Sequence, residues 1–181
     1  MDNGIVVLVS GPCGSGKTTV SRLLAEGCEG PAVHMHTDDF YGYIKKGYIP
    51  PWQEGSGAQN GTVINAAAAC AGEYARGGYT VFVDGVIGPW FLGPWLELVM
   101  EGMDVRYIVL LPGEEETLAR AAGRGPQGDP ELKPENVSAM WRMFADLGEY
   151  GPHALDTAGQ SPEETAAVLG VALAEGLYEL L

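Results

Sequence analysis

The segment Gly11-Pro12-Cys13-Gly14-Ser15-Gly16-Lys17-Thr18 decides the fold of this chain. It fits the phosphate-binding pattern G-x-x-x-x-G-K-[ST]. Residues 5–9 before it form a short apolar run typical of a strand buried on both faces, and residues 18–28 after it have the apolar spacing of a helix. Because strand, loop and helix follow one another directly, the segment predicts a site for the phosphates of ATP.

Each part of this loop has a predicted task. Glycines allow successive backbone N–H groups to surround a phosphate, and the helix N-terminus adds the positive end of a dipole. Lys17 is expected to reach the β and γ phosphates, and the Thr18 hydroxyl to ligate Mg²⁺. The residues predicted to bind ATP here are Gly11, Pro12, Cys13, Gly14, Ser15, Gly16, Lys17, Thr18 and Thr19.

Composition narrows the class of protein. The chain has 181 residues and a formal net charge of −14, and no linker divides it, which predicts a single domain over residues 1–181. A surface this acidic repels nucleic acid and anionic membranes, so neither is an expected partner. The three cysteines are an odd number without a CxxC pair, and no segment resembles a signal peptide or a membrane span. The cytoplasm is therefore the expected compartment.

Predicted strands and helices alternate along the chain, which indicates an α/β fold with a parallel sheet covered by helices on both faces. Residues 40–60, rich in Gly, Pro and aromatic side chains, are expected to be irregular. The strands are expected at 5–9, 32–36, 79–83, 105–111 and 153–156. The helices are expected at 18–28, 62–76, 90–100, 114–122 and 134–147, with a last one that begins after the capping residue Ser161.

Two adjacent carboxylates follow the second predicted strand. Asp38 and Asp39 lie in the stretch His-Thr-Asp-Asp-Phe-Tyr. The carboxyl ends of neighbouring parallel strands line one crevice, where ligands bind. A carboxylate there can accept a proton from an attacking hydroxyl group, although an aspartate can also simply cap a turn. Two carboxylates so close can also divide the tasks of proton acceptance and metal binding.

The phosphate loop, this acidic stretch and the turn Val-Asp-Gly-Val at 83–86 resemble the small P-loop phosphotransferases. These include chloramphenicol phosphotransferase, shikimate and gluconate kinases, zeta-toxin-like kinases, and uridine and nicotinamide riboside kinases. The resemblance implies a three-layer P-loop fold with a five-stranded parallel sheet and a short lid. It also implies ATP, Mg²⁺ and transfer of the γ phosphate to a hydroxyl group. By its position Asp38 matches the general base of these kinases, and Asp39 is the second choice.

Asp84 ends the third predicted strand as the carboxylate of a Walker-B element would. The resemblance implies that it contacts Mg²⁺, through water, or the acceptor. An aspartate that merely begins an Asp-Gly turn is an equally good interpretation of the sequence.

Two arginines precede a Gly-rich loop. Arg120 and Arg124 share one helix face if the helix runs through both, and residues 120–132 match the lid of the resembling kinases. Lid arginines in those kinases neutralise charge in the transition state. Arg120 could instead pair with Glu116 one helical turn earlier, which makes Arg124 the better candidate. Arg120 and Thr157 are also predicted to contact ATP. Thr157 follows the last strand, where the resembling kinases hold adenine, although a simple strand-to-helix turn is an equally good interpretation of this segment.

The acceptor site is predicted at residues 38–60 and 84–95, where aromatic side chains gather beside a few polar groups, as in a small-molecule pocket. The candidate acceptor-binding residues are Asp38, Tyr41, Trp52, Asp84 and Trp90. Their composition favours a neutral, partly apolar or ring-containing acceptor with a hydroxyl group, such as an antibiotic, a nucleoside or a sugar. The alternatives are a nucleoside monophosphate kinase, or a nucleotide-binding module that hydrolyses ATP slowly or not at all and acts on a protein partner. Neither the exact acceptor nor the oligomeric state follows from the sequence.

Overall fold

The centre of the molecule is a five-stranded sheet in which all strands are parallel, and their order is β2-β3-β1-β4-β5. The computed structural model describes residues 4–123 and 133–180. Its strands are β1 (Ile5–Ser10), β2 (Ala32–His36), β3 (Thr80–Gly85), β4 (Asp104–Leu110) and β5 (Ala154–Leu155). The predicted α/β fold with a five-stranded parallel sheet is confirmed.

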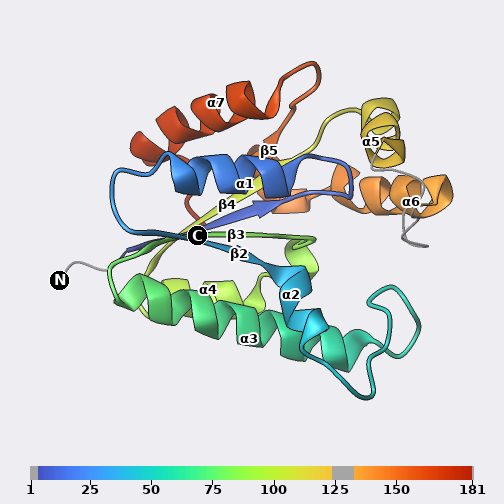
Figure 1. The fold of residues 1–181 in the computed structure, drawn as a ribbon, viewed down its shortest axis with the longest axis horizontal. Coiled ribbons are helices and arrows are strands. Elements are labelled where there is room, and N and C mark those ends of the chain that lie inside the picture. Colours follow the sequence, from blue (N-terminus) through green and yellow to red (C-terminus); the bar gives the residue numbers. More distant parts are fainter. Residues whose placement is uncertain (1–3, 124–132, 181) are drawn as a thin grey trace.

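Helices cover both faces of the sheet, so the fold has three layers (Figure 1). One layer contains α1 (Lys17–Glu26) and α7 (Pro162–Ala174), and the other contains α3 (Gly57–Arg76) and α4 (Gly93–Met100). The remaining helices lie toward the edge where the strands end; they are α2 (Thr37–Gly42), α5 (Glu114–Ala122) and α6 (Pro134–Ala145). The carboxyl ends of the strands therefore lie close to α2, α5 and α6.

Alternate residues of the central strand enter two different cores. Val6 and Leu8 of β1 pack in the cluster that includes α3 and α4, whereas Val7 and Val9 pack in the cluster that includes α1 and α7. This follows from the period of two in a strand, with apolar contacts on both faces. It explains why the sequence at 5–9 is uninterrupted by polar residues.

Several predicted boundaries are wrong. The segment 40–60 is not irregular throughout, because α2 begins at Thr37 and α3 begins at Gly57 rather than at Thr62. The early start of α3 is stabilised by Asn60, whose side chain donates to Pro51 O at 2.8 Å and to Ser56 Oγ at 3.1 Å. Asp38 and Asp39 therefore lie in the first turn of a helix, where the dipole favours carboxylates.

Two further elements are shorter than predicted. The last strand contains only residues 154–155, because His153 belongs to the 3₁₀ segment Gly148–His153. The helix expected at 90–100 begins at Gly93, after a 3₁₀ turn at Pro89–Phe91. The predicted C-terminal helix does have its capping box, formed by Ser161 and Glu164.

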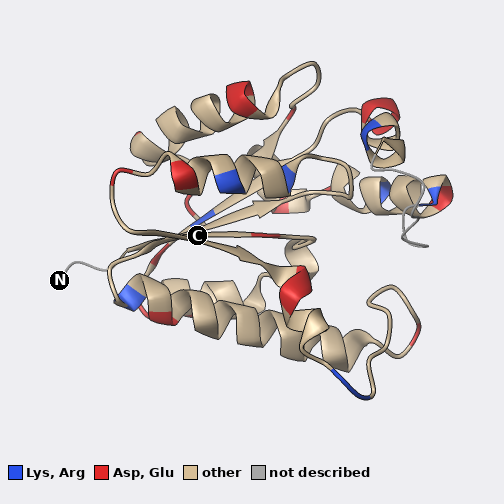
Figure 2. Ribbon diagram, in the orientation of Figure 1, with Lys and Arg blue, Asp and Glu red and all other residues tan. Residues whose placement is uncertain are grey.

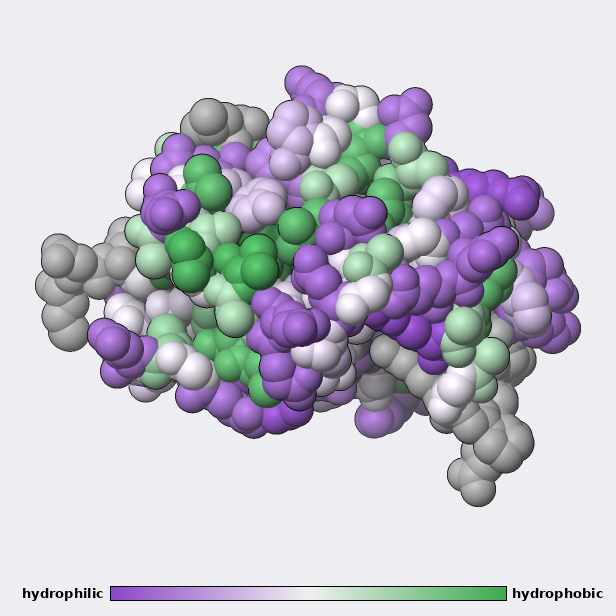
Figure 3. Space-filling view, turned by 90° about the horizontal axis from the view of Figure 1, so that it is seen from above, coloured by the Kyte–Doolittle hydropathy of each residue, from purple (hydrophilic) through white to green (hydrophobic). Residues whose placement is uncertain are grey.

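Acidic residues are distributed over the helices of both layers (Figure 2). By contrast, the face formed by α1 and α7 has an apolar patch (Figure 3), and Val168 and Val171 of α7 are exposed. Within residues 4–123 and 133–180, no helix combines the length and the apolar character needed to cross a membrane.

Candidate active site

The phosphate loop connects the end of β1 to the start of α1, as predicted. Gly11 has φ of 142°, and a Cβ at this position would lie 2.4 Å from Leu110 O, so only glycine fits. Gly16 caps α1 with φ of 92° and has open space on its Cβ side. The loop is closed by a hydrogen bond from Ser15 N to Pro12 O at 3.2 Å. The predicted residues Cys13 and Gly14 lie within this turn, and Thr19 lies in the first turn of α1.

The loop has the groups that a phosphate needs. Lys17 is 7% exposed, and its ammonium donates to Pro12 O at 3.2 Å, which holds it over the loop. Ser15 Oγ is buried and, in the described part of the chain, has no hydrogen-bond partner. A buried hydroxyl without a partner is costly unless a ligand satisfies it. Both groups fit a phosphate anion bound at the N-terminus of α1.

Asp84 lies at the centre of the polar cluster and is fully buried. It is paired in register with His36 across β2 and β3, so both side chains project from the same face of the sheet. His36 Nδ1 contacts Asp84 Oδ1, and His34 Nε2 lies 3.7 Å from Asp84 Oδ2. Burial would raise the pKa of Asp84, but the imidazoles of His34 and His36 and the hydroxyl of Thr18 outweigh it and hold the pKa far below its ordinary value. The carboxylate is therefore ionised.

Asp38 lies beside this cluster, on α2. Its Oδ2 is 3.2 Å from His36 Nε2. The side chain of His36 lowers the pKa of Asp38, partial desolvation of the exposed carboxylate opposes this effect, and the charge of Lys17 contributes to lowering it. In turn, contacts with Asp38 and Asp84 raise the pKa of His36 to about 10, so this imidazole is a cation at neutral pH. The structure thus brings Asp38 and Asp84 together around His36, and the charge of Lys17 acts on Asp38.

His34 and His36 are not among the site residues that the sequence predicts. The available signal was their position: they alternate along β2, and His36 is the last residue of that strand. Asp39 is exposed on α2, and the carboxylate that His36 contacts is that of Asp38. No group of three or more His, Cys, Asp and Glu side chains in residues 4–123 and 133–180 could hold a metal ion.

Arg120 connects α5 to the segment after β5. Its guanidinium forms an ion pair with Glu116 and also donates to Thr157 O at 3.4 Å and Gln160 O at 3.2 Å. The alternative pairing with Glu116 is therefore present, together with contacts to the predicted adenine end. Thr157 is buried, and its Oγ1 has no hydrogen-bond partner among the described residues. Arg124 and the predicted lid residues 124–132 lie outside the described residues.

The predicted acceptor residues are in different surroundings. Tyr41 on α2 donates to Asn60 Oδ1 at 3.2 Å, and burial, with the nearby Asp38, raises its pKa to about 12. Trp90 packs against Phe144 with ring centroids 5.6 Å apart, and 44% of Trp90 is exposed. Trp52 lies between α2 and α3 and is 53% exposed. Of these three aromatic residues, Tyr41 is the one whose pKa is raised by the charge of Asp38.

A cavity of about 310 Å³ lies next to α2, the helix that carries Asp38. Its lining comes from α2 and α3 and is mainly apolar; it consists of Phe40, Tyr43, Ile44, Gln59, Thr62, Val63 and Ala66. Gln59 also hydrogen-bonds both backbone groups of Ile49, which fixes the loop between the two helices. The aromatic stretch after β2 thus packs the loop and borders this cavity, whose lining includes none of the predicted acceptor residues Asp38, Tyr41, Trp52, Asp84 and Trp90.

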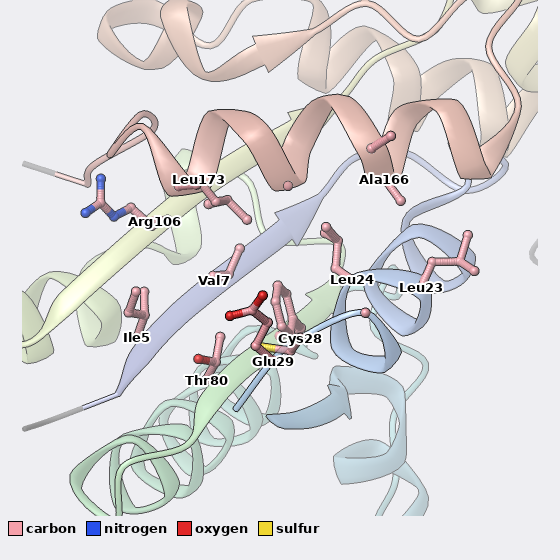
Figure 4. A pocket seen from close by; sticks show the side chains of 15 residues that line it. Ile5, Val7, Leu23, Leu24, Cys28, Glu29, Thr80, Arg106, Ala166 and Leu173 are labelled. Atoms are coloured by element: carbon pink, nitrogen blue, oxygen red, sulfur yellow. The ribbon is translucent and has the colours of Figure 1, made fainter. Parts of the chain in front are cut away.

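A larger cavity, of about 630 Å³, lies between α1, α7 and the sheet (Figure 4). Ile5 and Thr80, the first residues of β1 and β3, contribute to its lining, so it lies toward the opposite edge of the sheet from the phosphate loop. Its only arginine, Arg106, is already bound to Asp104 and to the carbonyl groups of Gly176 and Leu177. Volume alone would favour this cavity as the ligand site, but the reactive groups lie elsewhere.

The comparisons with known proteins agree with this geometry. The sequence model of a family described as AAA domain matches residues 7–140, about three quarters of the chain. No curated protein matches the chain. Among solved structures, the tunicamycin resistance protein of Deinococcus radiodurans has a TM-score of 0.66 and 19% identity, over 98% of this chain and 99% of that one.

Two kinases have the same fold. The APS kinase of Mycobacterium tuberculosis in complex with AMPPNP and APS has a TM-score of 0.65 and 16% identity, over 97% of this chain and 99% of that one. Shikimate kinase from Acinetobacter baumannii in complex with shikimate has a TM-score of 0.60 and 19% identity, over 97% and 96% of the two chains. The predicted resemblance to the small P-loop phosphotransferases is confirmed.

Proposed function

Because the chain belongs to this AAA domain family and has the fold of the small P-loop kinases, we propose that it is an ATP-dependent kinase for a small hydroxyl-bearing molecule. The γ phosphate of ATP is transferred to a hydroxyl group of the acceptor. The observation that supports this proposal best is the position of Asp38, directly after the carboxyl end of β2: its Oδ2 lies 3.2 Å from His36 Nε2, and the same ring contacts the buried Asp84.

The loop residues have the tasks expected for phosphoryl transfer. Backbone N–H groups of residues 13–16 and the Lys17 ammonium hold the β and γ phosphates, and Ser15 Oγ gains the partner it lacks among the described residues. This cradle also offsets the repulsion that a net charge of −14 exerts on the nucleotide. Positioning and charge stabilisation supply most of the rate in such reactions.

Thr18 and Asp84 would hold Mg²⁺ between them, Thr18 through its hydroxyl and Asp84 directly or through water. Asp84 fits this task because it is buried and ionised, and its Oδ2 has no hydrogen-bond partner within the described residues. Mg²⁺ usually takes one or two protein ligands and obtains the others from phosphates and water. When bound, the ion neutralises charge on the transferring phosphoryl group.

Asp38 acts as the general base that accepts the proton of the acceptor hydroxyl. Its low pKa keeps it ionised, as a base must be before the reaction. The aromatic ring of Tyr41, on the same helix as Asp38 and with a raised pKa to which Asp38 contributes, supports an acceptor that is partly apolar and carries a ring. The acidic net charge argues against nucleic acid as the acceptor.

A coupled assay of ADP release tests the proposal, with a panel of nucleosides, sugars and aminocyclitol antibiotics as acceptors. We expect an acceptor-dependent signal from the unaltered chain. Asp38→Asn should keep the affinity for ATP and lose transfer by about 10²- to 10⁴-fold, the usual contribution of a general base. Glu163→Gln, which removes one exposed carboxylate from the first turn of α7, is the matched charge control.

Other outcomes distinguish the alternatives. Full transfer by Asp38→Asn together with loss in Asp39→Asn would move the base to Asp39. ATP hydrolysis that no acceptor in the panel stimulates would favour a nucleotide-binding module that acts on a protein partner. Transfer to nucleoside monophosphates alone would instead identify a nucleoside monophosphate kinase.

A further inference from the structure

His36 stands between two carboxylates, one on each side of its ring. Nδ1 contacts Asp84 Oδ1, and Nε2 lies 3.2 Å from Asp38 Oδ2. We propose that His36 is a positioning residue that holds the Asp38 carboxylate in its reactive orientation and is itself anchored by Asp84. This inference rests on the proposed function, because it assigns the task of orienting the base in that reaction.

The anchor is rigid. Asp84 is fully buried in β3, and His36 is its register partner at the end of β2. The hydrogen-bond ladder between two parallel strands fixes both backbones, and His34, two residues earlier on the same face, lies on the other side of the Asp84 carboxylate. The His36 ring therefore has one well-defined direction, set by the sheet.

The Asp38 side chain is less constrained by the fold than His36 and Asp84. The side chain of Asp38 is 70% exposed, and its helix α2 has only six residues. An exposed aspartate normally samples several rotamers, and fixing one of them costs conformational entropy. A contact with a fixed imidazole selects one orientation before the acceptor binds. The contact uses Oδ2, which leaves Oδ1 as the atom to accept the hydroxyl proton.

The same contact explains which of two adjacent carboxylates is the base. Asp38 and Asp39 have the same chemistry and adjacent positions on α2, but the His36 ring contacts Asp38. Orientation to within about 0.5 Å is what separates a working base from a nearby carboxylate, and a misplacement of about 1 Å can cost 10²-fold in rate. The difference between the two aspartates thus comes from β2 and not from α2.

Two substitutions of His36 distinguish its contact with Asp38 from its contact with Asp84. In His36→Gln the amide nitrogen reaches roughly as far as Nε2 and can still donate to Asp38. In His36→Asn the amide nitrogen corresponds to Nδ1 and can still donate to Asp84, but the contact with Asp38 is lost. A positioning role predicts that His36→Asn lowers kcat by about 10- to 100-fold with little change in KM for ATP, and that His36→Gln restores most of kcat. His36→Gln leaves the buried Asp84 Oδ1 without its partner and should unfold at a lower denaturant concentration than His36→Asn, so a higher kcat in His36→Gln would not come from greater stability.

An independent readout does not require turnover. Three-bond coupling constants in the labelled protein report χ1 of Asp38, and we expect one rotamer in the unaltered chain and in His36→Gln, but averaging in His36→Asn. Averaged couplings in the unaltered chain, or unchanged kcat in His36→Asn, would overturn the inference. A chain with one fixed Asp38 rotamer that phosphorylates nothing would refute the proposed function and leave the positioning role standing.

Discussion

The side chain of Thr37 lies directly against the Cα of Gly85. A Cβ at position 85 would be 2.1 Å from Thr37 Oγ1 and 2.9 Å from Thr37 Cβ, and Thr37 is 2% exposed. Gly85 is the last residue of β3, and Thr37 is the first residue of α2. This close approach places the start of α2, and with it Asp38, beside the end of β3.

Gly85→Ala should therefore displace α2 and disable the base. The added methyl group overlaps three atoms of a buried side chain, which costs about 1–3 kcal/mol in the free energy of unfolding and moves Asp38 away from His36. We expect kcat to fall by at least about 10-fold with unchanged affinity for ATP, measured by steady-state kinetics and calorimetry. Gly170→Ala in α7, where a Cβ meets nothing within 4 Å, is the control and should be neutral or stabilising. Equal kcat in both variants would contradict this.

Lys17→Ala should abolish transfer. Lys17 is buried and held against Pro12 O, so its ammonium is fixed over the phosphate loop rather than free in solvent. Loss of one such charge typically costs about 10²- to 10³-fold in kcat, and binding of ATP should weaken as well. Arg22→Ala, on the exposed side of α1 and paired only with Glu26 in the described contacts, is the matched control. Normal turnover by Lys17→Ala would exclude the loop from the reaction.

Arg120→Ala separates the two predicted tasks of this arginine. Because Arg120 holds the backbone carbonyl groups of Thr157 and Gln160, we expect its loss to weaken ATP binding by about 10-fold, close to the value of one charged hydrogen bond. Arg142→Ala on α6, an exposed arginine that pairs with Glu114 at 3.7 Å, serves as the control. Isothermal titration calorimetry measures the affinity of both variants for ATP. Unchanged ATP affinity together with a lower kcat would indicate instead the lid role in the transition state.

Trp95→Ala tests the core beneath the acceptor side. Trp95 is fully buried in the cluster that joins α3, α4 and the sheet, so its truncation should lower the free energy of unfolding by about 3–5 kcal/mol. Trp95→Phe should lower the free energy of unfolding by less. Trp95 Nε1 has no hydrogen-bond partner among the described residues, so removing it breaks no hydrogen bond there. Urea denaturation measures both. Trp52→Ala is the control, and its exposed side chain should contribute within about 0.5 kcal/mol. Similar losses in the two alanine variants would contradict this view of the core.

The sequence was sufficient wherever the signal is local or periodic. The phosphate loop, the buried strand before it and the helix after it occupy adjacent residues, and the loop chemistry requires glycine at fixed positions such as 11 and 16. The Asp-Asp pair after β2 could be placed at the ligand edge because parallel strands all end at one edge. Boundaries were less accurate: α2 and the early start of α3 depend on capping contacts such as that of Asn60 with Pro51.

Local sequence patterns could not predict which side chains contact one another in the site. His36 and Asp84 are 48 residues apart, and they meet only because β2 pairs with β3 in one particular register. A shift of that register by one residue would turn the imidazole to the other face of the sheet.

The sequence by itself thus determined where the phosphate loop lies and which carboxylates follow the strands, because those depend on neighbouring residues and on the strand period. The tertiary structure decided which aspartate is oriented, which histidine orients it, and where Arg120 binds, because these contacts cross between elements that only the packed sheet and helices bring together.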